Sequence, residues 1–120
     1  MNLELDIEQI RTFLLMGDVG SAVKWMEKRL TRAKFMQMAT KKQVYADLQE
    51  AYGLLLEMLK GKLSPDDMVT KLLDPMYANM FGNIEDVEVY LNNFAFYARY
   101  SIDRYNVDYP NYDQKRCGDQ

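Results

Sequence analysis

Apolar residues recur at spacings of three and four along almost the whole of this 120-residue chain. Such spacing places them on one side of an α-helix, because the helix has 3.6 residues per turn. No segment alternates apolar and polar residues over five or more positions between turn signals, as a half-buried strand would. The sequence therefore predicts an all-α protein, a compact bundle of four principal helices with one or two short extra helices.

Gly17 and Asp18 divide the first two predicted helices. A helix over about residues 5–16 ends at Gly17, since glycine readily adopts the left-handed conformation that follows a helix. Asp18 is placed to cap the next helix, because an aspartate at this position accepts hydrogen bonds from free backbone amides. The buried stripes that we expect on these two helices are Ile7, Ile10, Phe13 and Leu14, and Ala22, Val23, Met26, Leu30 and Ala33.

The second helix has a candidate break near Ala39. The stretch "TKKQ" has the form of a capping box, in which the Thr40 side chain accepts from the backbone of Gln43 and the glutamine reaches back. One long helix running through this point is the alternative, and the sequence leaves it open. The next helix is expected to end at Gly61. Its predicted stripe is Val44, Leu48, Ala51, Leu55 and Leu59.

The second half begins with "KLSPDDMV", where Ser64 is an N-cap and Pro65 occupies the first helical position. Pro75 disfavours helical geometry in the residue before it, so this short helix is expected to finish by Leu73. "PMYANMFG" predicts one more short turn or helix. Asn83 is expected to cap the last long helix. The predicted stripe of that helix is Val87, Leu91, Phe94, Ala98 and Ile102, flanked by Tyr90, Tyr97, Tyr100 and Tyr105.

We expect residues 1–106 to form a single helical domain and residues 107–120 to form a flexible polar C-terminal tail. The tail holds the chain's one cysteine, Cys117, so an intramolecular disulfide is impossible and a reducing cytoplasm suits the chain. No run approaches the 18 or more apolar residues of a membrane span, and the N-terminus has no basic flank. We therefore expect a cytoplasmic protein without a membrane partner.

The chain contains no histidine, which removes imidazole bases, Ser-His and Cys-His pairs and His-containing zinc or iron sites. The densest acidic cluster is Glu85, Asp86 and Glu88, beside the predicted start of the last helix. Negative charge there favours the positive end of the helix dipole, so we interpret these residues as capping and solvation. We expect no catalytic residues, no metal and no cofactor, and hence a protein that is not an enzyme.

Charge is distributed unevenly along the chain. The net charge is −3, yet seven basic residues and only one acidic residue, Glu27, lie between residues 24 and 42. Helical spacing gathers several of them into a basic face, with Arg29 and Arg32 on an exposed flank. Whether Trp25 belongs to the core or to an interface is left open by the sequence. The candidate partner-binding residues of this face are Lys24, Trp25, Lys28, Arg29 and Arg32.

Nine tyrosines and nine methionines provide a second signal, because both residue types favour interfaces as well as small helical cores. The last helix carries aromatic residues on more of its circumference than one buried stripe requires. Some of them should remain exposed. The candidate interface residues there are Tyr97, Tyr100 and Arg104.

Together these features predict a non-enzymatic helical protein-protein interaction module, an adaptor, regulator or inhibitor whose partner has an acidic surface. The alternative is nucleic-acid binding through the basic face, using phosphate contacts with little sequence preference. The overall pI of about 4.9 opposes that alternative unless the basic face is well segregated. A homodimer is also expected, because it would bury surplus apolar and tyrosine surface.

Overall fold

The computed structural model describes residues 2–108 of the chain, with the side chains of residues 2–104. Within residues 2–108 there is no strand, and the all-α bundle of four long helices with two short ones is confirmed. Most of the predicted tail, residues 109–120, lies outside the described residues. The elements are α1 (Leu3–Leu15), α2 (Val19–Thr40), α3 (Gln43–Leu59), α4 (Pro65–Leu72), the 3-10 helix η1 (Pro75–Phe81) and α5 (Val87–Asp108).

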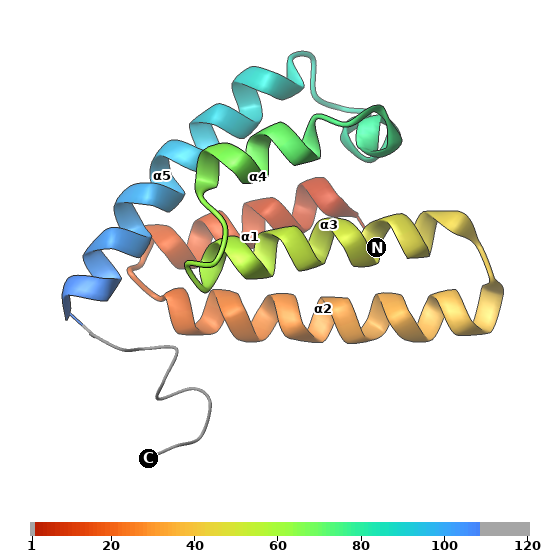
Figure 1. Cartoon of the computed structure of the whole chain (residues 1–120), viewed down its shortest axis with the longest axis horizontal. Helices are drawn as coiled ribbons and strands as arrows, with labels where there is room; N and C mark the ends of the chain where they lie inside the picture. Colours follow the sequence, from red (N-terminus) through yellow and green to blue (C-terminus); the bar gives the residue numbers. More distant parts are fainter. Residues whose placement is uncertain (1, 109–120) are drawn as a thin grey trace.

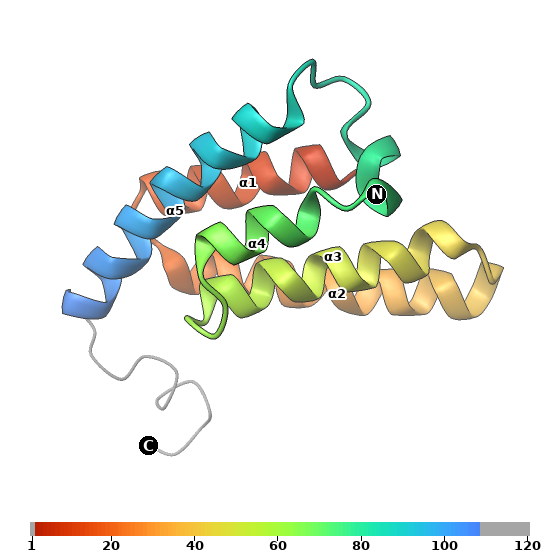
Figure 2. The same ribbon diagram turned by 45° about the horizontal axis from the view of Figure 1, so that its top comes forward.

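Helices α2 and α3 form a long antiparallel hairpin that makes the most extensive contact between any two elements (Figure 1). Helix α1 packs against α2 and α5, and α4 lies between α3 and α5. In both views the connected ends of α2 and α3 extend past the other helices (Figure 2). None of the described helices is both long enough and apolar enough to span a bilayer.

The helix boundaries near Gly17 and Gly61 agree with the sequence predictions. Both glycines have positive φ, 74° and 76°, and each follows the end of a helix. The Asp18 side chain accepts from the backbone N–H of Ser21 at 2.9 Å, so it caps α2 as expected. Helix α1 begins at Leu3, two residues earlier than predicted, because the Asn2 side chain accepts from the Leu5 amide.

The predicted break after α2 exists, but the predicted capping box at Thr40 is wrong. The Thr40 hydroxyl donates to the Met36 carbonyl at 2.8 Å, which makes it part of the last turn of α2. The chain then turns at Lys41, in the left-handed conformation with φ 60°. Helix α3 starts without a side-chain cap, and Gln43 instead donates to Asp47. The break therefore depends on the turn at Lys41.

The prediction that Asn83 caps the last helix is also wrong. Helix α5 begins four residues after it, and the Asp86 side chain accepts from the Val89 amide at 3.1 Å. A carboxylate also interacts more favourably with the helix dipole than an amide does. The interpretation of the Glu85–Glu88 stretch as a helix-capping segment is thus confirmed at Asp86.

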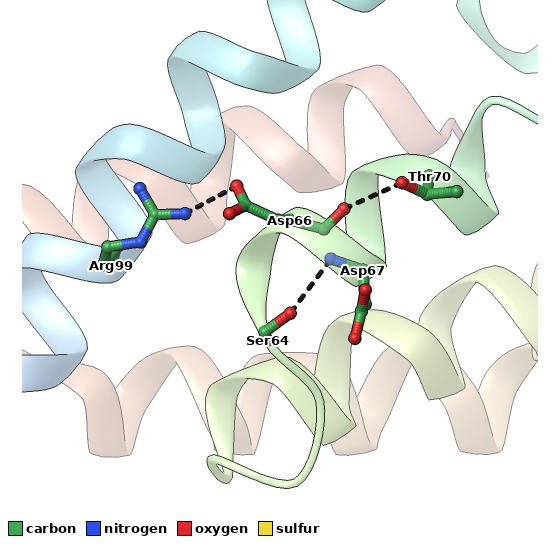
Figure 3. A network of polar contacts seen from close by, with 5 residues as sticks. All are labelled: Ser64, Asp66, Asp67, Thr70 and Arg99. Atoms are coloured by element: carbon green, nitrogen blue, oxygen red, sulfur yellow. Dashed lines mark hydrogen bonds and ion pairs between the residues drawn. The ribbon is translucent and has the colours of Figure 1, made fainter.

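The short helix α4 begins as predicted and is held against α5. Ser64 accepts from the Asp67 amide at 3.0 Å, and Pro65 is the first helical residue. Figure 3 shows Arg99 of α5 reaching Asp66 in the first turn of α4, with the Arg99 Nη2 atom 2.5 Å from the Asp66 carboxylate. This ion pair is exposed, so it contributes little to stability.

One hydrophobic core joins all six elements. The predicted stripes are buried, except that Phe13, Leu30 and Val87 are half-buried and Val44 is exposed. Placing Val44 in the core was wrong because the first turn of α3 lies at the projecting end of the hairpin. The core also contains one buried carboxylate, Asp6 of α1, and the buried ring of Tyr52 from α3.

Candidate interaction surfaces

An open groove of about 650 Å³ lies between the C-terminal end of α1 and helix α5. Its walls include large apolar side chains that remain exposed to solvent. Met16 is 71% exposed, Phe96 67% and Tyr100 65%. We call this surface the aromatic groove; its members are Leu14, Leu15, Met16, Gly17, Phe96, Tyr97, Tyr100, Ser101 and Arg104.

Contacts between α1 and α5 hold the base of the aromatic groove. The Ser101 hydroxyl donates to the Leu14 carbonyl at 3.0 Å, and both residues are buried. The same carbonyl also accepts from the backbone N–H of Gly17 at 3.0 Å, so the Ser101 hydroxyl gives it a further hydrogen bond. Because Leu14 lies on α1 and Ser101 on α5, the bond links the two walls of the groove. The groove is thus built on two packed helices and on the turn at Gly17.

The aromatic groove continues into a smaller polar hollow that shares Phe96 and Tyr97 with it. The Arg11 guanidinium lies 5.0 Å from the centre of the Tyr97 ring. Within the described residues the Nε atom of Arg11 is buried and has no hydrogen-bond partner. Arg104 lines the groove as well. The apolar walls therefore lie beside two arginine side chains.

Glu8 and Tyr90 close the far side of that hollow. The Tyr90 hydroxyl donates to the Glu8 carboxylate at 2.5 Å, and Arg11 lies 3.7 Å from the same carboxylate. Burial, followed by this hydrogen bond and the charge of Glu8, raises the pKa of the Tyr90 hydroxyl. Tyr90 therefore serves α1–α5 packing rather than an exposed surface.

Three members of the predicted basic face are exposed on α2. Lys24, Lys28 and Arg32 follow one another at intervals of four residues, so they form a row along the outer side of the helix. Trp25 is half-buried, with its ring 6.4 Å from that of Phe13 in an edge-on arrangement. Most of the Trp25 ring therefore packs inside the protein rather than at an exposed interface.

Arg29 does not lie on an exposed flank, contrary to the expectation from helical spacing. Its Nε atom is 3.1 Å from Oδ1 of buried Asp6, and its guanidinium lies 5.9 Å from the centre of the Trp25 ring. The Tyr52 hydroxyl donates to the other carboxylate oxygen of Asp6 at 2.5 Å. Burial, then the bond to Asp6, raises the pKa of Tyr52. Arg29 therefore joins α2 to α1 inside the fold.

The described part of the chain contains no cluster of three or more acidic or cysteine side chains able to hold a metal ion. Its concave surfaces combine exposed apolar side chains with a few charged ones. Such surfaces bind by excluding water from apolar area and by matching charge at the rim.

The sequence placed Tyr97, Tyr100 and Arg104 on one surface, and the structure brings all three to the aromatic groove. The sequence patterns did not predict three further members of the groove, Leu15, Met16 and Phe96. A signal was present for Leu15 and Met16, which are apolar residues off the buried stripe of α1 and next to a turn. Phe96 lies between Ala95 and Ala98, which are buried, so it is likewise a large apolar residue off the buried stripe of its helix.

No family model, no curated protein and no solved structure matches this chain significantly.

Proposed function

We propose that the protein is a non-enzymatic interaction module that binds a segment of a protein partner in the aromatic groove. The observation that carries this proposal is the exposure of Met16, Phe96 and Tyr100 around one concave surface. Exposing several large apolar side chains together is unfavourable in water and is typical of sites that bind another protein. Complete burial of a phenylalanine or methionine side chain contributes roughly 1.5–3 kcal/mol, and most of the Met16 and Phe96 side chains is still exposed.

The composition of the groove indicates the chemistry of the segment that it would bind. Tyrosine and phenylalanine provide rigid contact area, and methionine adapts its shape to the partner. Arg11 and Arg104 lie beside this apolar surface, and the Arg11 side chain is 37% exposed. We therefore expect a segment with an apolar anchor residue and a nearby carboxylate. The sequence also predicted a partner with an acidic surface, but from the basic face of α2.

Affinity capture with matched variants tests this proposal. The immobilised wild-type protein should retain a partner that a Phe96→Ser/Tyr100→Ser variant loses. Val89→Ser is the matched control, because Val89 is also an exposed apolar residue of α5 but does not line the groove. Equal capture by all three proteins, or no saturable capture by the wild type, would contradict a binding site in the groove.

A further inference from the structure

A second groove, of about 670 Å³, lies on α3 next to the end of α4 and η1. It is separate from the aromatic groove and shares no residue with it. Leu54, Leu73 and Met76 give it apolar surface, and the last two are exposed to solvent. We call it the acidic groove, because carboxylates line its rim.

Three carboxylates and one lysine line the acidic groove: Glu50, Glu57, Asp74 and Lys71. Glu50 and Glu57 are seven residues apart on α3, so they lie on one side of the helix about 10 Å apart along its axis. The Tyr77 hydroxyl contacts Glu50 at 3.4 Å. Burial, followed by the neighbouring charges of Glu50, Asp47 and Asp74, raises the pKa of Tyr77 to about 12.

Gly53 lies in the middle of α3 and lines the acidic groove between the two glutamates. Glycine in a helix interior is less stable than alanine, so its presence there requires a reason. A Cβ atom built on Gly53 would meet nothing within 4 Å, which means that packing inside the protein does not demand a glycine. The missing side chain instead leaves room for another backbone or a large side chain to approach α3 from outside.

The outer side of α2 carries the opposite charge together with apolar side chains. Lys28, Arg32 and Phe35 follow at intervals of four and three residues, so they form one stripe along the helix. Lys28 and Arg32 make no ion pair within the described residues. Phe35, near the C-terminal end of α2, is 59% exposed. Met38, one turn further on, is exposed as well.

The two surfaces complement each other in charge and in apolar content. Lysine and arginine on α2 match the glutamates of the acidic groove, and Phe35 matches its apolar side chains and the space above Gly53. Within the described residues, no ion pair joins the two surfaces of one molecule. We propose that the α2 stripe of one copy docks in the acidic groove of a second copy. A two-fold symmetric pair makes this contact twice, which closes the assembly as a dimer.

Complementary charge reversal tests this dimer by light scattering or sedimentation equilibrium. The wild type should approach twice the chain mass of 14.1 kDa as concentration rises from micromolar to millimolar. Glu50→Lys/Glu57→Lys and Lys28→Glu/Arg32→Glu should each remain monomeric, since like charges then face each other. An equimolar mixture of the two variants should recover the dimer, because both contacts are again between opposite charges. Added salt should weaken wild-type association.

Gly53 provides a second test that does not depend on charge. Gly53→Ala should raise the melting temperature of the monomer by several degrees, because alanine favours the helix and has room. Gly53→Gln should also fold, yet it should weaken dimerisation at least tenfold by filling the space that Phe35 needs. A Gly53→Gln protein that is as dimeric as the wild type would overturn this mode of docking.

The aromatic groove supplies the control that separates this inference from the proposed function. Phe96→Ser/Tyr100→Ser should dimerise like the wild type, and loss of the dimer in that variant would place self-association in the aromatic groove. A wild-type protein that stays at 14.1 kDa at every concentration overturns the proposal. So does a monomer whose Lys28 and Arg32 bind a nucleic-acid duplex, because the stripe would then serve phosphate contacts.

Discussion

Arg29 of α2 and Asp6 of α1 form an ion pair inside the protein, with Arg29 Nε 3.1 Å from Asp6 Oδ1. The carboxylate is almost fully buried, and its other oxygen accepts from the Tyr52 hydroxyl of α3. Three helices thus meet at one charged group. A buried charge costs several kcal/mol unless its partners stay in place, so this cluster makes the packing of α1 sensitive to single substitutions.

Replacing Arg29 by methionine should destabilise the fold strongly. The Asp6 carboxylate would stay buried with only the Tyr52 hydroxyl as partner, and breaking such a pair costs roughly 3–5 kcal/mol. Lys34→Met, at an exposed position of α2 outside the proposed dimer contact, should change the free energy of unfolding by no more than about 0.5 kcal/mol. Urea unfolding followed by circular dichroism measures both. Equal stability of the two variants would show that the Asp6 pair does not hold α1 in place.

The residues that end α1 and that begin α2 and α4 were predictable, because their effects are local. Gly17, Asp18 and Ser64 each act on amides or carbonyls within a few residues, and sequence spacing is enough to find them. At Thr40 and Asn83 the chain offers competing polar groups nearby, and spacing alone does not decide which one caps the helix.

Contacts between distant segments could not be predicted. Asp6 and Tyr52 are 46 positions apart, and their bond depends on how α1 crosses α3. The aromatic groove depends in the same way on the packing of α1 against α5. Its tyrosines could be named from the surplus of aromatic residues on the last helix. Leu15 and Met16 form the opposite apolar wall. This wall could not be predicted, because the sequence does not show that the turn at Gly17 lies beside α5.

The assignment of the α5 cap leads to a simple comparison. Asp86→Ala should lower the free energy of unfolding by about 1 kcal/mol, because the Val89 amide loses its acceptor. Asn83→Ala, an equally exposed change in the same connection, should have little effect. Thermal unfolding of both variants decides between the two residues. A larger loss of stability in Asn83→Ala than in Asp86→Ala would show that Asn83 caps the helix.

Asp18 should make the stability of α2 depend on pH in the acid range. Hydrogen bonds from the Ser21 hydroxyl and amide lower the pKa of Asp18 below its ordinary value of 3.8. A lowered carboxyl pKa gives stability that is present above the unfolded pKa and lost as pH falls through the folded one.

The uncharged cap Asp18→Asn isolates this effect. It should match the wild type in acid and be less stable at neutral pH, since asparagine also caps helices but carries no charge. Melting temperatures of both proteins between about pH 2 and pH 6 measure the gap. A gap that does not change with pH would contradict the predicted role of the charge.

Tyrosine ionisation should be coupled to unfolding in alkali. Burial raises the pKa of Tyr77 to about 12 and also raises those of Tyr52 and Tyr90, each of which donates to a carboxylate. A raised pKa gives stability that is complete below the ordinary value of 10.0 and is lost as pH rises toward the folded value. Tyrosinate absorbance and helical circular dichroism, recorded together, should show a late ionisation step that coincides with loss of helix. Complete ionisation near pH 10 with the helices intact would contradict the burial of these hydroxyls.

The central claim is that the aromatic groove binds a protein partner, and site-specific photo-crosslinking tests it most directly. A photoreactive phenylalanine analogue placed at Tyr100 in extracts of the native cells should give one dominant adduct with a partner protein. The same analogue at Val89, exposed on α5 away from the groove, should give no such adduct. Excess unlabelled wild-type protein should compete the adduct away, whereas excess Phe96→Ser protein should not. Absence of any competable adduct at Tyr100, or the same adduct from both positions, would contradict the proposed function.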